Sequence, residues 1–228
     1  MRIEAIEKSS ILANPSVSQV VIASNLKSTS IRMALTSAEL NAIYHFRYSI
    51  HVKEITPTQY YADHINRVIQ DPFDHGAYNF AAFEDDKVVG VLRVNFSRTS
   101  NVSYYENFLN MKSVGPFHPR ATSICTRLMV APRLRGTSLA LRLCQAGYEF
   151  GLRHEIRYNF LDCNDHLTRF FERLGYRFQE RAEHPEYGIG NVMRLDLLDR
   201  PHLAQIRSPF LAVLNSANAL GESAPGIA

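Results

Sequence analysis

A short basic turn joins an apolar strand to an amphipathic helix in the stretch Leu128-Met129-Val130-Ala131-Pro132-Arg133-Leu134-Arg135-Gly136-Thr137-Ser138-Leu139. Pro132 ends the strand, and Gly136 permits the backbone to approach a ligand closely. The first N–H groups of a helix have no partner within the helix and carry partial positive charge, so a pyrophosphate can dock on them. Arg133 and Arg135 add charge to the same turn. The turn is therefore a candidate phosphate site, with an ordinary basic turn before a helix as the alternative.

Apolar periodicity on both sides of this turn predicts alternating strands and helices. The acidic turn Glu84-Asp85-Asp86-Lys87 separates two apolar runs and indicates a hairpin. We expect strands at residues 77–83, 88–96, 122–130, 157–163, 176–179 and 191–197, and helices at residues 36–50, 100–112, 137–154 and 165–174. This order predicts a mixed α/β sheet with a strand–helix–strand unit in its middle.

The main domain is expected to span residues 35–200, between an N-terminal extension (1–34) and a C-terminal tail (201–228). Thr36-Ser37-Ala38-Glu39 reads as a capping box that starts the first helix. Val20–Ile22 is a candidate short strand within the extension, and residues 55–76 read as a loop with one helical turn. The tail is rich in small residues at its end and is expected to fray there.

Composition excludes several classes of function. The chain has 228 residues, of which 46% are hydrophobic and 21% are charged, as in an ordinary globular domain. A net charge of +3 falls short of a dense basic face, so no nucleic-acid partner is expected. No apolar run is long enough to span a membrane. Three cysteines, Cys125, Cys144 and Cys163, each lie within an apolar run, and this odd number predicts a reduced cytoplasmic setting without a disulfide framework. They form no CxxC pair, so no metal site is expected.

The basic turn resembles the Arg/Gln-x-x-Gly-x-Gly/Ala signature of the Gcn5-related N-acetyltransferases (GNAT), with Ser138 at the final small position. The resemblance implies an α/β fold with a mostly antiparallel central sheet flanked by helices, and no permanently bound cofactor. It also implies that the turn holds the pyrophosphate of coenzyme A, or the phosphopantetheine of an acyl carrier protein, as co-substrate. The donor-binding positions carried over from this motif are Leu128, Met129, Val130, Arg133, Arg135, Gly136, Thr137, Ser138 and Leu139.

A second segment supports the same resemblance. Asn164 precedes the run DHLTRFFERLGY of residues 165–176, which is similar to the family's Asn…Phe-Tyr-Glu-Lys-Leu-Gly-Phe segment beside the thioester. Phe171 stands in the place of a tyrosine that often protonates the leaving thiolate. A thiolate, with a thiol pKa near ~8.5, leaves readily without such an acid. Asn164 and Phe171 are thus candidate donor-binding residues, although Phe171 is equally well explained as core.

Residues 44–130 resemble a narrower group, the acyl-homoserine-lactone synthases and the related long-chain N-acyl amino acid synthases. Those families share an Arg-x-x-Val/Ile-aromatic helix, an Asp-x-x-Asp loop, a Gly-x-x-Arg strand and a Ser/Thr-Arg strand in this order. The matching residues here lie in YHFRYSIHVKE (44–54), DPFD (71–74), GVLR (90–93) and CTRLMV (125–130). Ile124 stands where the lactone synthases usually carry glutamate, which favours an amino acid or other small amine as acceptor over S-adenosylmethionine.

Arg47 is the arginine with the clearest physical argument. It lies on the same helical stripe as Leu40, Ile43 and Ile50, and a guanidinium that cannot lose its charge needs an anionic partner when buried there. The alternative is that Arg47 reaches solvent from the helix edge. Arg93 and Arg127 also interrupt apolar strands. The three arginines are expected either to form a buried ionic network with acids such as Asp74 that positions the amine, or to serve as structural salt bridges.

The resemblance implies direct transfer of a medium- or long-chain acyl group from an acyl carrier protein or acyl-coenzyme A thioester to the amine of an amino acid or similar molecule. A backbone N–H near Met129 or Val130 would polarise the carbonyl, and Glu54 and Asp74 are the candidate bases. An acyl-cysteine route through Cys125 or Cys163 has little support. An acetyl-coenzyme A acetyltransferase and a non-catalytic acyl-thioester-binding module stay open as alternatives. The candidate catalytic residues are Glu54, Asp74, Arg47, Arg93 and Arg127, and Arg47→Ala is expected to abolish the product while the protein stays folded.

Overall fold

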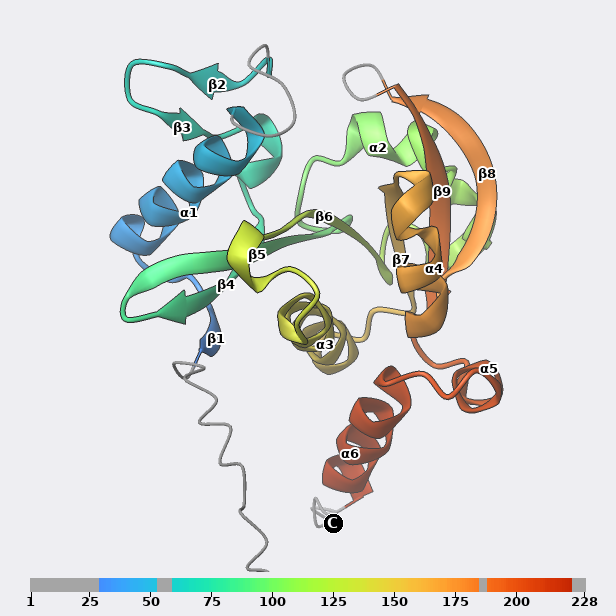
Figure 1. The fold of residues 1–228 in the computed structure, drawn as a ribbon. Helices are drawn as coiled ribbons and strands as arrows, with labels where there is room; N and C mark the ends of the chain where they lie inside the picture. Colours follow the sequence, from blue (N-terminus) through green and yellow to red (C-terminus); the bar gives the residue numbers. More distant parts are fainter. Residues whose placement is uncertain (1–28, 53–58, 185–187, 223–228) are drawn as a thin grey trace, which may run out of the picture.

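The computed structural model describes residues 29–52, 59–184 and 188–222. Within these residues, seven strands form one sheet in the order β1-β4-β5-β6-β7-β9-β8 (Figure 1). All neighbouring strands are antiparallel except β6 and β7. The mixed, mostly antiparallel α/β architecture is therefore confirmed. The strands are β1 (Ser30–Met33), β4 (Tyr78–Glu84), β5 (Lys87–Phe96), β6 (Thr122–Val130), β7 (Tyr158–Cys163), β8 (Arg177–His184) and β9 (Gly188–Asp196).

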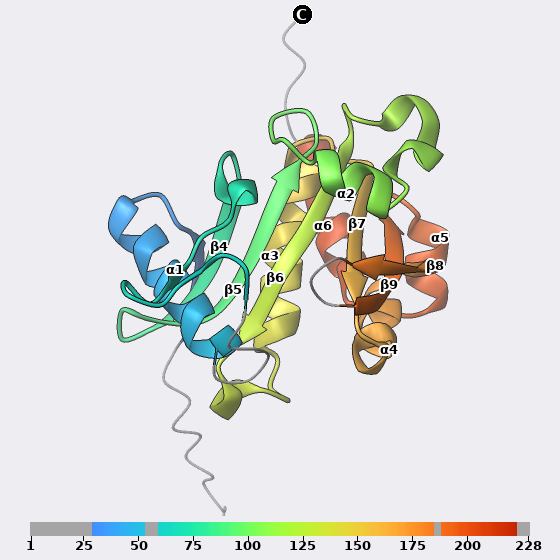
Figure 2. The same cartoon turned by 90° about the horizontal axis from the view of Figure 1, so that it is seen from above.

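Helices cover both faces of the sheet (Figures 1 and 2). On one face, α1 (Ser37–Ile50) buries Ile43 against Val91 and Phe83, and α2 (Ser103–Phe108) covers a different part of the same face, where Tyr105 packs with Ile124 and Phe160. On the other face, α3 (Leu139–Arg153) buries Leu143 in the largest core cluster. That face also holds α4 (Asp165–Leu174), α5 (Arg200–Gln205) and α6 (Phe210–Glu222), and short 3-10 helices lie at Pro72–Asp74, Met111–Phe117 and Pro132–Leu134.

The capping box at the start of α1 forms as expected. Thr36 Oγ1 accepts from the Glu39 N–H at 3.2 Å, and Glu39 Oε2 accepts from the Thr36 N–H at 3.1 Å. Two otherwise unpaired donors of the first turn are thereby satisfied. Because the cap fixes where the helix begins, it also fixes which face carries Arg47 toward the sheet.

The strands β6 and β7 separate along their length. They pair only through Thr122–Ile124 with Tyr158–Phe160, although β6 continues to Val130 and β7 to Cys163. Figures 1 and 2 show the two strands side by side at one end and apart at the other. The sheet is therefore open in its middle, between the end of β6 and the end of β7.

A β-bulge lies in β6, in its pairing with β5. Val91 pairs with Met129 and Arg93 pairs with Thr126, so Leu92 of β5 opposes both Arg127 and Leu128. Arg127 adopts a positive φ of 56°. A bulge of this kind bends its strand and re-aims a side chain, which is why bulges gather near functional sites.

Several expectations at the chain ends and in the front loop need correction. The first part of the tail is helical at residues 200–205 and 210–222, and Phe210 stacks on Tyr148 of α3 with ring centroids 4.3 Å apart, whereas the end expected to fray lies outside the described residues. Ser30–Met33, assigned to the extension, pairs with β4. The front loop contains a small hairpin of β2 (Ala62–Asp63) and β3 (Val68–Ile69). The expected helix at 100–112 is only α2 followed by a 3-10 segment, and Val20–Ile22 lies outside the described residues.

Candidate active site

Two carboxylates are set by the local sequence Asp71-Pro72-Phe73-Asp74. Asp71 caps the 3-10 helix by accepting from the Phe73 N–H at 3.0 Å, while its own N–H donates to Asp74 Oδ2 at 2.9 Å. Pro72 suits the first helical position because it has no N–H to leave unpaired. This reciprocal cap holds both side chains in one orientation, toward the sheet.

Three arginines converge on these carboxylates from three different elements. Arg47 of α1 donates to Asp74 Oδ1 at 2.7 Å, and Arg93 of β5 contacts both Asp71 and Asp74. Arg127, at the β6 bulge, donates to Asp71 Oδ2 at 2.6 Å. The side chains of Arg47 and Asp74 have no exposed surface. The buried ionic network that the sequence offered as one alternative is therefore present, and Arg47 does not reach solvent.

The edge of this network carries a histidine. Arg127 Nη1 donates to His51 Nε2 at 2.8 Å, so that nitrogen acts as an acceptor and the ring is neutral. Burial, reinforced by the charge of Arg127, lowers the pKa of His51 to about 4. His51 thus adds a hydrogen-bonding group to the network without adding charge at neutral pH.

The ionic network should make stability depend on pH. Burial alone would raise the pKa of Asp71, but the charges of Arg93 and Arg127 outweigh it and hold that pKa at about 2, from 3.8. The stabilisation is therefore complete above pH 3.8 and is lost as the pH falls to about 2; it is worth about 2 kcal/mol. Urea unfolding of the wild type and Asp71→Asn should show a stability difference that shrinks by this amount over that window. A difference independent of pH would contradict this assignment.

A cavity of about 510 Å³ opens where β6 and β7 separate. Its wall includes Thr126–Met129 of β6, Leu161–Cys163 of β7, and Asn164 and Phe171 at the start and in the middle of α4. This volume falls within the range of pockets that bind small molecules. The opening in the sheet is thus a ligand-sized space whose shape follows from strand separation.

The part of the cavity on the α3 face is mostly apolar. Gly147 and Gly151 lie one helical turn apart on α3, where a Cβ on either would come within 3.0 Å of a leucine side chain. Tyr148 satisfies its hydroxyl by donating to the Leu197 carbonyl at 2.6 Å, which leaves its ring as the lining surface. The apolar lining on this side consists of Leu92, Cys125, Cys144, Gly147, Tyr148, Gly151, Leu161, Leu195 and Leu197. Ser123, Asn159 and Tyr176 also line it, and their polar groups are paired with one another: Tyr176 donates to Asn159 Oδ1 at 2.6 Å, and Asn159 donates to Ser123 Oγ at 2.8 Å.

The opposite part of the cavity is polar and lies toward α1 and α2. Its lining includes His51, Arg127, Asp162 of β7, His184 of β8 and Tyr105 of α2. Asp162 is the only carboxylate among the described residues that line the cavity. One space therefore joins a charged end to an apolar end through the sheet.

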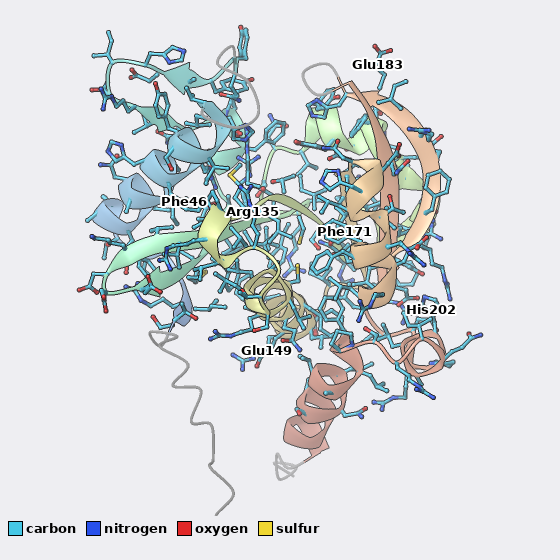
Figure 3. All side chains as sticks on the ribbon, in the orientation of Figure 1. Phe46, Arg135, Glu149, Phe171, Glu183 and His202 are labelled. Carbon is cyan, nitrogen blue, oxygen red and sulfur yellow. The ribbon has the colours of Figure 1, made fainter. Side chains whose placement is uncertain are left out.

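The basic turn before α3 is open to solvent. The exposed residues of this turn are Arg135, Gly136, Thr137 and Ser138. Gly136 has a φ of 77°, and a Cβ added to it would have no other atom within 4 Å. Ser138 makes no side-chain cap on the helix. Thr137 does accept from the Leu139 N–H, and Arg133 is paired with Glu84. Figure 3 shows Arg135 on this turn and Phe171 on α4, the two elements beyond the wide end of the sheet opening.

The cysteines are poorly suited to a covalent route. All three are free thiols, and burial raises the pKa of Cys125 to about 12 and that of Cys163 to about 11. The thiolate is the nucleophilic form, so such thiols are inert at neutral pH. The described residues hold no group of three or more His, Cys, Asp or Glu side chains that fits a metal ion.

The predicted residues differ in their access to this opening. Leu128, Met129, Arg127, Asn164 and Phe171 line the cavity. Arg47, Arg93 and Asp74 are not among its described lining residues; Asp74 borders a separate hollow beside α1. Val130 and Leu139 are buried core residues next to it. Glu54 lies outside the described residues.

The sequence reasoning did not single out His51, Asp162, His184 or Tyr105. Asp162 left a usable signal, because it is an acid near the end of an apolar strand, directly before the Cys163-Asn164 step. His184 and Tyr105 carried no such signal, since only the fold brings β8 and α2 to the same end of the cavity.

A family model described as the acetyltransferase (GNAT) family matches residues 40–176, more than half of the chain. The chain belongs to this family. The GNAT match runs from α1 through α4 and so includes the ionic network, the basic turn and most of the cavity wall. No match was found among curated proteins. No helix within the described residues is long and apolar enough to cross a membrane.

Solved structures share the fold of this GNAT protein at low sequence identity. BjaI, a coenzyme A-dependent acyl-homoserine lactone synthase, aligns with 18% identity and a TM-score of 0.60 over 84% of this chain and 100% of that chain. The acyl-homoserine lactone synthase LasI aligns with 16% identity and a TM-score of 0.59, over 78% and 94%. FeeM, an N-acyl amino acid synthase from uncultured soil microbes, aligns with 15% identity and a TM-score of 0.56, over 78% and 97%.

Proposed function

We propose that this protein is an N-acyltransferase that moves a medium- or long-chain acyl group from an acyl-coenzyme A or acyl carrier protein thioester to the amine of an amino acid or similar small molecule. One observation carries the proposal: a single cavity joins a charged end to an apolar end through the opening between β6 and β7. An acetyl group needs no such apolar extension. The fold shared with BjaI, LasI and FeeM is consistent with this activity.

The donor would enter at the wide end of the opening. Its phosphates would sit on the exposed turn Arg135–Ser138 and the first amides of α3, which carry partial positive charge. Its pantetheine arm would follow Leu128 and Met129 on one side and Asn164 and Phe171 on the other. The acyl chain would then continue into the apolar part beneath α3, where each buried methylene contributes about 0.8 kcal/mol.

The reacting carbonyl would lie at the β6 bulge. The bulge displaces the backbone around Arg127 and Leu128 from regular pairing, and an amide there would polarise the carbonyl of the donor. Arg127 is the arginine of the network that also lines the cavity, which suits it to bind the carboxylate of an amino acid acceptor. Arg47, Arg93, Asp71 and Asp74 would act as positioning residues that hold Arg127 and the bulge.

The proposal is tested by assaying free-thiol release with acyl-coenzyme A donors from C2 to C16 and with acyl carrier protein donors, each with mixed amino acids. Products are identified by mass spectrometry. We expect N-acyl amino acids from long donors at rates well above those with acetyl-coenzyme A. Preference for acetyl-coenzyme A would instead identify an acetyltransferase, and binding of donor without thiol release would identify a non-catalytic module.

Gly136→Ala should weaken donor binding by about 10-fold in KM, with kcat changed less, because the methyl group would stand between the turn and a phosphate. No atom of the protein lies within 4 Å of that position, so internal packing does not change. Gly115→Ala is the matched control: Gly115 also has a positive φ, 58°, and no atom within 4 Å. Both variants place an alanine at a positive φ, and thermal unfolding measures the strain cost of each. Equal donor KM values for the two variants would contradict a donor site at this turn.

A further inference from the structure

We propose that Asp162 binds the amine of the acceptor and accepts its proton as the amide bond forms, with Arg127 holding the acceptor's carboxylate, so that the acceptor is an α-amino acid. This rests on the proposed function and assigns the proton acceptor and the acceptor class of the same site.

Asp162 lies in the part of β7 that β6 no longer covers. The parallel pairing ends at Phe160, and Asp162 pairs only on its other side, with Val192 of β9. Its neighbours Leu161 and Cys163 belong to the core on the α3 face, so the alternation of a strand turns Asp162 toward the α2 face. The carboxylate therefore stands in the cavity wall at the polar end, beside the point where the sheet opens.

The other acids of the site are occupied by arginines. Asp74 is fully buried between Arg47 and Arg93, and Asp71 is held by Arg93 and Arg127. The strong pairing that lowers the pKa of Asp71 to about 2 makes that carboxylate a very weak base. The neutral ring of His51 already accepts a hydrogen bond from Arg127. None of these three groups is placed to take a proton from a substrate in the cavity.

The surroundings of Asp162 favour proton transfer. Burial raises the pKa of Asp162, while His184 of β8 and Arg127 of β6 oppose this rise in part. Tyr104 and Tyr105 of α2 face the same carboxylate, which contributes to the raised pKa of each phenol. A carboxylate whose pKa lies nearer to neutrality is a better general base than an ordinary surface aspartate.

The two charges match an α-amino acid zwitterion. Arg127 and Asp162 both line the cavity and are close enough for the guanidinium to affect the carboxylate. A bound zwitterion would place its carboxylate on Arg127 and its ammonium on Asp162, and the nitrogen would then face the carbonyl at the bulge. A simple amine without a carboxylate would use only one of the two contacts.

The proton balance of the step is complete without another reagent. The ammonium form of the acceptor loses two protons, the C–N bond forms, and the C–S bond breaks. Asp162 accepts one proton from the nitrogen and passes it to water, which restores the carboxylate; the second proton ends on the departing thiolate to give the thiol. The products are the N-acyl amino acid and the free thiol of the donor.

The experiment compares the wild type, Asp162→Asn and Asp86→Asn with an amino acid and with hydroxylamine as acceptors. Hydroxylamine is largely unprotonated at neutral pH and depends less on a base. With the amino acid, Asp162→Asn should lower kcat by about 100-fold or more, while donor binding stays unchanged. With hydroxylamine the loss should be less than about 10-fold. Asp86 lies in the exposed β4–β5 turn, so Asp86→Asn should match the wild type with both acceptors.

The outcomes separate the two proposals. A wild type that releases no thiol with any donor overturns the proposed function itself. An active wild type with Asp162→Asn within about 3-fold of it, or with equal losses for both acceptors, overturns the role of Asp162 alone. If Asp162→Asn does not fold, carboxyl ¹³C NMR of the wild type decides. The pKa read from the Asp162 signal must then lie above the usual aspartate range. The signal must also shift when an amino acid is added, and it must not shift when the matching amine without a carboxylate is added. Failure of either test overturns the proposal.

Discussion

Arg47→Ala is expected to lower the free energy of unfolding by about 3–5 kcal/mol, a large share of the 5–15 kcal/mol typical of a domain. Burial disfavours the charge of Arg47 and lowers its pKa, and Asp74 offsets that effect. Removing the guanidinium leaves the buried Asp74 with the longer ionic contact to Arg93, at 3.3 Å, and the hydrogen bond from the Asp71 N–H, and it removes a donor from Asn79 Oδ1. The cost comes from the unpaired buried charge and exceeds the net value of the original pair.

Urea unfolding of Arg47→Ala against Arg153→Ala tests this expectation. Arg153 makes an exposed i,i+4 pair with Glu149, and its loss should cost less than about 0.5 kcal/mol. A change below about 1 kcal/mol in Arg47→Ala would show that the network does not stabilise the fold.

This expectation differs from the one drawn from the sequence, that Arg47→Ala would abolish the product while the protein stays folded. Arg47 has no exposed surface and is not among the described residues that line the cavity. Loss of product in that variant would therefore report destabilisation of the network. Arg127 is the informative position for catalysis, because it belongs to the same network and also lines the cavity.

Much of the fold was predictable because local signals and tertiary packing agree. The capping box of α1, the acidic hairpin turn and the Gly175 end of α4 each fix an element through neighbouring residues alone. The errors lie where distant contacts decide. The strand Ser30–Met33 exists because β4 offers an unpaired edge, and α6 is held by Phe210 against Tyr148. Neither contact leaves a trace in the local sequence.

The candidate site was predictable to the level of residue types and order. Arginines within apolar stripes indicate buried partners, and the DPFD turn supplies them, so the network follows from the sequence. Access to the cavity does not follow, since it depends on where β6 and β7 separate and on the bulge at Arg127. These two features decide that Asp162 faces the cavity while Asp74 does not.

The apolar end of the cavity gives the second large expected effect. Cys144 of α3 is buried, lines the cavity and lies close enough to Cys125 of β6 for the two thiols to affect each other. A larger side chain at this position would fill the space between α3 and β6. The charged end, the bulge and the basic turn would stay unchanged, because none of them is formed by Cys144.

Cys144→Phe should therefore lower kcat/KM for donors of C12 and longer on the order of 100-fold, since about four methylenes at about 0.8 kcal/mol each would lose their burial. Activity with acetyl- and butyryl-coenzyme A should change less than about 3-fold. Ala146→Phe is the control for overpacking, because Ala146 lies on α3 against the same core but is not among the described lining residues. Thermal unfolding of both variants measures the packing cost, about 1–3 kcal/mol in each. Equal losses across all chain lengths in Cys144→Phe would place the acyl chain elsewhere, because only a chain that extends beneath α3 can make the effect depend on its length.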